Sequence, residues 1–158
     1  MSKTDFLFLD GKAHRSDKLL VSANNRSFRY GDGFFETMKW DHNQILLADY
    51  HFERLFKSIA QLHFEPPAYF NRSYLESQVK ELVKMNNHSK LARIRITIFR
   101  GEGGLYDVVN HFPHHLIQTW DLNPAIQLLN ENGLVIDIYR EAKKISDGFS
   151  HIKTNNFL

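Results

Sequence analysis

Residues Leu91–Phe99 read LARIRITIF, and this stretch decides the class of fold. Small or branched apolar residues alternate in it with arginine and threonine, and successive side chains of a β-strand point to opposite faces of the sheet. The stretch therefore predicts a strand with one face in the core and one cationic face that carries Arg93 and Arg95. Two cations so close repel each other unless solvent or an anion lies opposite, and both solvent and a substrate carboxylate remain open as that partner.

Shorter runs before this stretch predict further strands. Residues 6–9 read FLFL and are followed by Asp-Gly, which indicates a hairpin with a return strand near residues 12–14. Residues 28–40 are aromatic and strand-like, and after a turn residues 44–47 pair back as their partner strand. We therefore expect an antiparallel sheet that opens with a β-hairpin.

Two segments between these strands change to a helical period. In the first, Asp49 is the expected N-cap, the two prolines at 66–67 are the expected end, and apolar residues recur at Phe52, Leu55, Phe56, Ile59 and Leu62. The second is expected to begin near Asn71 and to stop near residues 86–87, with Leu75, Val79, Leu82 and Val83 on one face. Both helices are amphipathic, so we expect each of them to cover the sheet.

Strands and helices are grouped along the chain instead of alternating strictly, which favours an α+β fold over a doubly wound parallel sheet. Residues 116–120 and 134–139 are expected to form further strands. The predicted organisation is a small α+β domain at residues 1–120, with its antiparallel sheet covered by two helices. An interdomain linker follows at residues 121–133, and residues 134–158 begin a second, β-rich domain.

Composition excludes several classes of function. The chain has 158 residues, a net charge of +2, no cysteine and no run of five like charges. These features argue against a nucleic-acid surface and remove disulfides, thiolate metal sites and cysteine nucleophiles. The first apolar run, at residues 6–9, is too short for a signal peptide or a membrane span, so we expect a soluble cytoplasmic protein without a membrane partner.

Three positions are candidates for chemistry, and each has a plainer interpretation. The Gly31-Asp32-Gly33 run is expected to be a turn or bulge that needs a positive φ beside a cleft. Arg54 lies off the apolar stripe of its helix and is either a solvated arginine paired with a neighbour such as Glu53 or Asp49, or a planar fork for a phosphate. Lys153 is either an ordinary exposed lysine or an amine that attacks an aldehyde to form a Schiff base.

A metal site is not expected. The chain has nine histidines, and they are scattered along it. The group His111, His114 and His115 has no carboxylate nearby in the pattern that a zinc site requires.

Three motifs in the same order resemble those of the class IV aminotransferases, the fold-type IV pyridoxal phosphate enzymes. They are RYGDGFFET at residues 29–37, HFERL at residues 51–55 and KTNNFL at residues 153–158. The family includes branched-chain aminotransferases, D-amino-acid aminotransferases and aminodeoxychorismate lyases. Phe157 stands where branched-chain enzymes carry a tyrosine, which makes that subfamily less favoured.

The resemblance implies roles for four residues. Lys153 would form the aldimine with pyridoxal 5'-phosphate and later move the proton between the substrate α-carbon and the cofactor. Arg54 would bind the cofactor phosphate. Tyr30 would line the substrate pocket, and Arg95 would engage a substrate carboxylate.

The implied activity is transamination between an amino acid and a 2-oxo acid, in a homodimer, with residues 134–158 as the start of the large cofactor-binding domain. The alternative within the family is a 4-amino-4-deoxychorismate lyase, because residues 100–104 are similar to a lyase loop. The alternative from another class is a non-catalytic α+β module that binds an anion or a partner through Arg93 and Arg95. Family members continue well past this lysine, so we expect the chain to be part of a longer enzyme and to be inactive alone.

Overall fold

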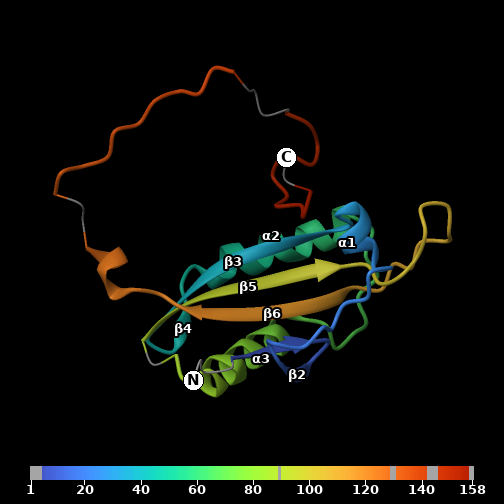
Figure 1. Cartoon of the computed structure of the whole chain (residues 1–158), viewed down its shortest axis with the longest axis horizontal. Coiled ribbons are helices and arrows are strands. Elements are labelled where there is room, and N and C mark those ends of the chain that lie inside the picture. The colour runs from blue at the N-terminus through green and yellow to red at the C-terminus, as the bar shows by residue number, and fades with distance from the viewer. Residues whose placement is uncertain (1–4, 89, 129–130, 142–145, 157–158) are drawn as a thin grey trace.

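The computed structural model describes residues 5–88, 90–128, 131–141 and 146–156. Their centre is one six-stranded sheet in the order β2-β1-β6-β5-β3-β4, in which every neighbouring pair is antiparallel (Figure 1). The strands are β1 (Phe6–Leu9), β2 (Lys12–Arg15), β3 (Gly33–Asp41), β4 (Gln44–Ile45), β5 (Leu91–Phe99) and β6 (His114–Asp121). The predicted antiparallel sheet and its opening hairpin are confirmed.

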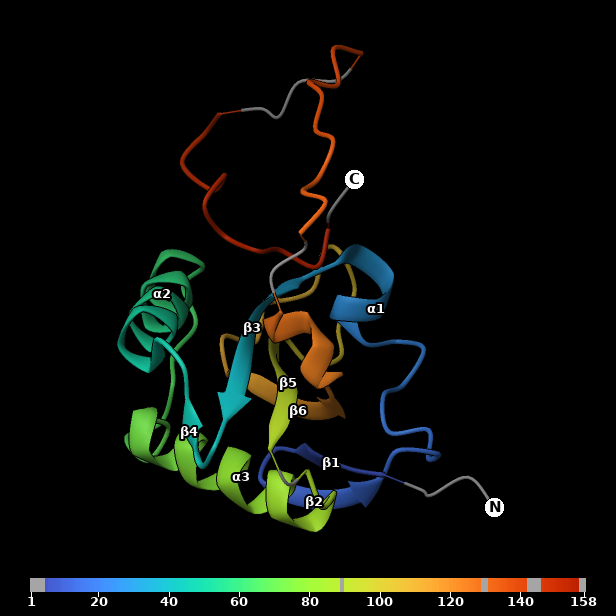
Figure 2. The same cartoon turned by 90° about the vertical axis from the view of Figure 1, so that its left-hand side faces the viewer.

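Two long helices cover one face of this sheet (Figure 2). The helices are α1 (Arg26–Tyr30), α2 (Ala48–Gln61) and α3 (Arg72–Met85), with a short 3₁₀ turn, η1 (Pro124–Gln127). Of the two long ones, α2 packs on β3, and α3 packs on β1 and β6. The α+β class is therefore confirmed. Among the described residues, no helix combines the length and the apolar character that crossing a bilayer requires.

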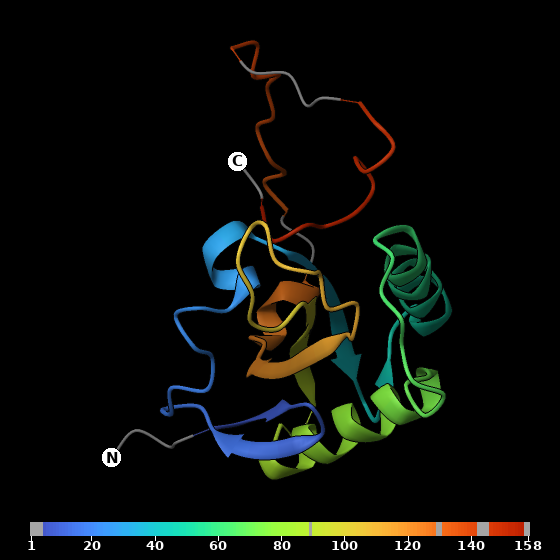
Figure 3. The same cartoon turned by 90° about the vertical axis from the view of Figure 1, so that its right-hand side faces the viewer.

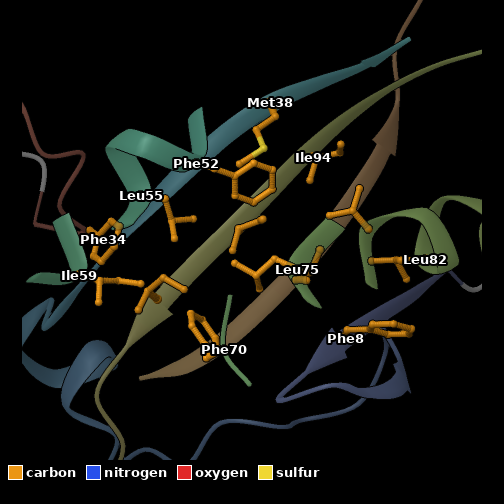
Figure 4. Packing of buried hydrophobic residues seen from close by; sticks show 14 of the residues in the cluster. Phe8, Phe34, Met38, Phe52, Leu55, Ile59, Phe70, Leu75, Leu82 and Ile94 are labelled. Atoms are coloured by element: carbon orange, nitrogen blue, oxygen red, sulfur yellow. The ribbon is translucent and has the colours of Figure 1, made fainter. Parts of the chain in front are cut away.

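The alternation of β5 produces the core as predicted. Ile94, Ile96 and Ile98 are fully buried, and they pack with residues such as Leu55 of α2 and Leu75 of α3 (Figure 4). Burial of each such side chain contributes about 1.5–3 kcal/mol to folding. The other face of β5 is not covered by either long helix, and this leaves its arginines available to solvent or a ligand.

Residues 28–30 are not part of the predicted strand. They belong to α1, whose N-cap Asn25 accepts a hydrogen bond from Ser27 N–H at 2.9 Å. The helix ends at Gly31, which has a φ of 67°, a conformation that glycine adopts without the strain that a Cβ imposes. The turn predicted at Gly31 is confirmed. The short helix before it was not predicted, because its aromatic residues suggested a strand.

The ends of α2 differ from the prediction, while those of α3 agree with it. Leu47, in the left-handed region, precedes α2 without a side-chain cap, so Asp49 lies in the first turn and is not the N-cap. The helix stops at Gln61, before the prolines, because the chain reverses at His63 with a φ of 56°. Asn71 caps α3 by accepting a hydrogen bond from Tyr74 N–H at 3.0 Å, and α3 ends just before Asn86.

The strand predicted at residues 134–139 is wrong. These residues form neither helix nor strand, and Val135 and Ile136 are 103% and 87% exposed. A strand is stable only when its backbone groups pair with a neighbour, and no described strand lies beside this segment. The proposed domain boundaries stay predictions, and residues 142–145, 157 and 158 of the second domain lie outside the described residues.

Candidate active site

A buried carboxylate on β3 is the centre of the candidate site. The alternation of β3 places Glu36 on the covered face of the sheet, where it is 2% exposed. Arg54 of α2 donates from Nε to Oε1 and from Nη2 to Oε2, both at 2.7 Å, and His51 Nδ1 lies 2.8 Å from Oε2. Burial raises the pKa of Glu36, but hydrogen bonds from Arg54 and His51 outweigh it and leave the pKa below its usual value.

Arg54 is therefore not a solvated arginine paired with Glu53 or Asp49. Glu53 binds Lys57 at 2.6 Å, and Asp49 binds Arg72 at 2.6 Å. The hydrogen bonds that Arg54 donates to Glu36 raise the pKa of Arg54, which keeps it charged. Its side chain is 38% exposed, and its Nη1 donates no hydrogen bond to the described residues. One edge of the guanidinium is thus fixed, and the other is available to an anion.

Lys153 is held beside this cluster by its backbone. Since β4 pairs only with the far end of β3, the first residues of β3 have a free edge, and the C-terminal segment returns to it (Figure 3). Phe35 N–H donates to Lys153 O at 2.9 Å, and Asn155 N–H donates to Gly33 O at 2.9 Å. The Lys153 side chain itself is exposed. Its ammonium is close enough to Glu36 to help lower the pKa of that carboxyl.

Arg95 lies on the uncovered face of the sheet, where its Cζ is 3.9 Å from the centroid of the Phe35 ring. It lines a pocket of about 460 Å³ together with Ser27, Phe28, Thr97, Gln118 and Asn155, and with Val21, Asn25, Phe99 and Leu116. Burial and the neighbouring Arg93 lower its pKa, and within the described residues no carboxylate pairs with it. The pocket thus contains a cation that lacks an anionic partner in this part of the chain.

Tyr30 ends α1, and its ring lies below the guanidinium groups of Arg26 and Arg29, with Cζ-to-centroid distances of 5.5 and 5.0 Å. It does not line the pocket of Arg95, although Ser27 and Phe28 of the same helix do. The structure thus binds Arg54 to Glu36 and the backbone of Lys153 to the adjacent Phe35, and it places Arg95 and Asn155 in one pocket, but Tyr30 does not line that pocket.

Sequence reasoning missed Asn155 and Asp32. Asn155 Nδ2 donates to Ser27 Oγ at 3.1 Å, and its Oδ1 is buried without a hydrogen bond among the described residues. Asp32 accepts from Arg26 Nε at 2.8 Å and from Arg100 Nη1 at 2.7 Å. A carboxylate that joins two arginines from distant segments fastens α1 to the end of β5, next to the pocket. Neither the hydrogen bond of Asn155 nor the ion pairs of Asp32 can be predicted from the spacing of residues in the sequence.

The structure also explains why residue 33 is a glycine, which the surrounding sequence does not reveal. A Cβ at this position would lie 2.5 Å from Ile98 O, so only glycine allows β3 and β5 to approach there. No group of three histidine, aspartate or glutamate residues in the described ranges is arranged to hold a metal ion.

Comparison with known proteins identifies the family. The sequence model of the family "Amino-transferase class IV" matches residues 33–158. The D-alanine aminotransferase of Bacillus licheniformis is 28% identical over 100 residues, which cover 63% of this chain and 30% of that protein. The aminodeoxychorismate lyase of Bacillus subtilis (strain 168) is 24% identical over 155 residues, which cover 96% of this chain and 51% of that protein. The chain thus spans about half the length of these relatives or less.

Solved structures show the same fold. The branched-chain aminotransferase of Thermoproteus uzoniensis with norvaline superposes with a TM-score of 0.67 at 21% identity, over 77% of this chain and 42% of that one. A hypothetical aminotransferase from Mycobacterium tuberculosis, in its pyridoxal phosphate-bound form, gives a TM-score of 0.61 at 19% identity, over 77% and 41%. Class IV aminotransferases depend on pyridoxal 5'-phosphate, which confirms the cofactor predicted from the resemblance. The chain belongs to the class IV aminotransferase family.

Proposed function

We propose that the protein containing this chain is a pyridoxal phosphate-dependent aminotransferase that moves an amino group between an amino acid and a 2-oxo acid. The observation that carries the proposal is that Lys153 and Arg54, from distant parts of the sequence, both bind one short stretch of β3: Lys153 O accepts from Phe35 N–H, and Arg54 donates to Glu36. An amine and a phosphate-binding fork must lie close together if one small cofactor is to reach both.

The residues fit a phosphorylated cofactor. Arg54 and Lys153 supply two positive charges against the single carboxylate of Glu36, and the surplus attracts an anion. The Nη1 edge of Arg54 would donate to the phosphate. When bound, the cofactor supplies an electron sink for the charge left when the substrate α-carbon loses its proton. Lys153 Nζ would hold and move that proton.

The pocket of Arg95 is the proposed place for the substrate. Arg95 would bind a substrate carboxylate, since it is a partly buried cation that no described carboxylate neutralises. Its guanidinium lies over the ring of Phe35, the residue whose backbone N–H also binds Lys153 O. The role of Tyr30 in lining the substrate pocket stays a prediction, although the pocket of Arg95 does not include it. A homodimer is likewise a proposal, and light scattering on the purified protein measures it.

The test uses the complete protein purified with pyridoxal phosphate. We expect a visible absorption band, and after borohydride reduction we expect mass spectrometry to find the cofactor on the peptide that contains Lys153. A colourless protein with no labelled lysine would instead support the non-catalytic anion-binding module.

A second candidate function is the aminodeoxychorismate lyase reaction. It is favoured by the coverage of that relative, which aligns with 96% of this chain against 63% for the D-alanine aminotransferase. Both reactions need the same amine and phosphate fork. Release of pyruvate from aminodeoxychorismate without a 2-oxo acid acceptor selects the lyase, and amino transfer from L- or D-amino acids to 2-oxoglutarate or pyruvate selects the aminotransferase.

A further inference from the structure

Glu36 is the acceptor around which Arg54 and His51 are arranged, and the proposed function gives it no role in binding or orienting the cofactor. It takes two parallel hydrogen bonds from Arg54, both at 2.7 Å, which fix the plane and the rotation of the guanidinium. His51 Nδ1 closes the remaining side at 2.8 Å. With Nε and Nη2 engaged, Nη1 is the edge of Arg54 that stays turned away from the carboxylate.

The position of Glu36 on β3 makes this arrangement rigid. Arg54 lies on a helix surface with 38% of its side chain exposed, where a guanidinium without a partner samples several rotamers. β3 is instead hydrogen-bonded to β5 along its length. The adjacent residue, Phe35, also binds the backbone of Lys153. Consecutive residues of one strand therefore orient the guanidinium of Arg54 and hold the backbone of Lys153.

We propose that Glu36 is the positioning residue of the cofactor site, whose carboxylate orients Arg54 so that Nη1 faces the cofactor phosphate. The inference rests on the proposed function and deepens it. Glu36 touches neither cofactor nor substrate in this scheme, and it acts through Arg54.

Glu36 could also act in the opposite direction and weaken phosphate binding. Whether a substitution at Glu36 weakens or tightens phosphate binding therefore separates the two roles. A carboxylate near a phosphate repels it, so a Glu36 that served only to neutralise Arg54 would weaken phosphate binding. Glu36→Gln removes that repulsion but places an amide NH₂ against an arginine donor, and the guanidinium then loses its paired geometry. Orientation predicts weaker phosphate binding in this variant, and neutralisation predicts tighter binding.

The experiment separates the phosphate contact from the lysine. The complete apoprotein is titrated by calorimetry with 4'-deoxypyridoxine 5'-phosphate, which has the phosphate but no aldehyde, and with pyridoxal, which has the aldehyde but no phosphate. For Glu36→Gln we expect at least tenfold weaker binding of the phosphorylated probe and no weakening for pyridoxal. Tighter or unchanged binding of the phosphorylated probe overturns the inference, as does an equal loss for both probes.

A double mutant tests whether Glu36 acts through Arg54. In an Arg54→Ala background, Glu36→Gln is expected to cause no further loss of the phosphorylated probe, because the group that it orients is gone. A full tenfold loss in that background rejects the positioning role. The matched control is Glu53→Gln, which removes the same charge one residue from Arg54 but only frees exposed Lys57, and it is expected to change nothing.

Glu36→Asp keeps the test decisive if Glu36→Gln does not fold. It retains the charge but is one methylene too short for the paired geometry, so the phosphorylated probe should again bind more weakly while thermal unfolding remains cooperative. Unaltered affinity in this variant contradicts orientation. If the wild-type protein binds neither probe and takes up no pyridoxal phosphate, the proposed function fails, whereas binding by wild type with no effect at Glu36 defeats this inference alone.

Discussion

On the sheet face that α2 and α3 cover, β5 contributes three fully buried isoleucines, whereas on the opposite face the same strand carries Arg93 and Arg95. Alternate residues of one strand therefore form the core and, in the proposed function, the binding face. Glu36 is the exception, since it is a charged residue on the covered face that belongs to the site. The difference implies that substitutions on the covered face should lower stability, whereas substitutions on the uncovered face should affect binding.

Lys153→Ala should give the largest effect and should leave both faces intact. Its side chain is exposed, and its segment is held by backbone hydrogen bonds, so the fold does not depend on the amine. We expect activity to fall by about 10²–10⁴-fold, the usual contribution of a positioned proton-transfer group. Turnover assays and circular dichroism measure this. Substantial remaining activity assigns the proton transfer to another group.

Ile96→Ala breaks the covered face. Because Ile96 is fully buried, the cavity and the lost transfer energy should lower the free energy of unfolding by about 2–5 kcal/mol. Arg93→Ala on the uncovered face is the matched control and should change it by no more than about 0.5 kcal/mol. Urea denaturation compares the two variants. Similar losses in both would show that the uncovered face also carries stability.

Arg54→Ala tests the proposed phosphate contact, which lies where α2 meets solvent. Loss of the phosphate fork should weaken cofactor binding by about 1.5–3 kcal/mol, the size of a hydrogen bond to a charged group. Equilibrium titration with pyridoxal phosphate measures it. Wild-type affinity in this variant removes Arg54 from the cofactor site.

The smallest expected effect is a dependence of stability on pH. The folded pKa of Glu36 is lowered, so its contribution to stability is complete above the unfolded value of about 4.3 and is lost as pH falls through the folded pKa. Wild type and Glu36→Gln should therefore converge in stability as the pH is lowered below about 4. Acid titration of the unfolding midpoint follows this. Parallel curves over the whole range would mean that the carboxyl titrates alike in both states.

Periodicity predicted the elements whose partners are set by local pattern. The alternation of residues 91–99 and the helical stripes of α2 and α3 each reflect one buried face, and these elements were confirmed. The strand at residues 134–139 failed because a strand needs a neighbour, which an apolar pattern does not supply. The turn of α1 was hidden because its cap, Asn25, lies among residues that also suit a loop.

The site was predictable only in part, for a related reason. Family motifs indicated Arg54 and Lys153, but the role of Glu36 was not predicted, because periodicity does not show which strand residue pairs with which helix residue. One signal was present. A glutamate on the apolar side of an alternating strand must have a partner, and this pattern marks Glu36 before any coordinates are seen.

The shortness of β4 has a consequence for how such a site can change. Since β4 leaves the beginning of β3 uncovered, the chain around Lys153 is held by main-chain hydrogen bonds, and residue 153 contributes only its carbonyl oxygen, which every amino acid has. The position of residue 153 thus depends on its backbone, and its chemistry depends on its side chain. A substitution at residue 153 could therefore introduce a different reactive side chain without changing the hydrogen bonds that hold the segment against β3.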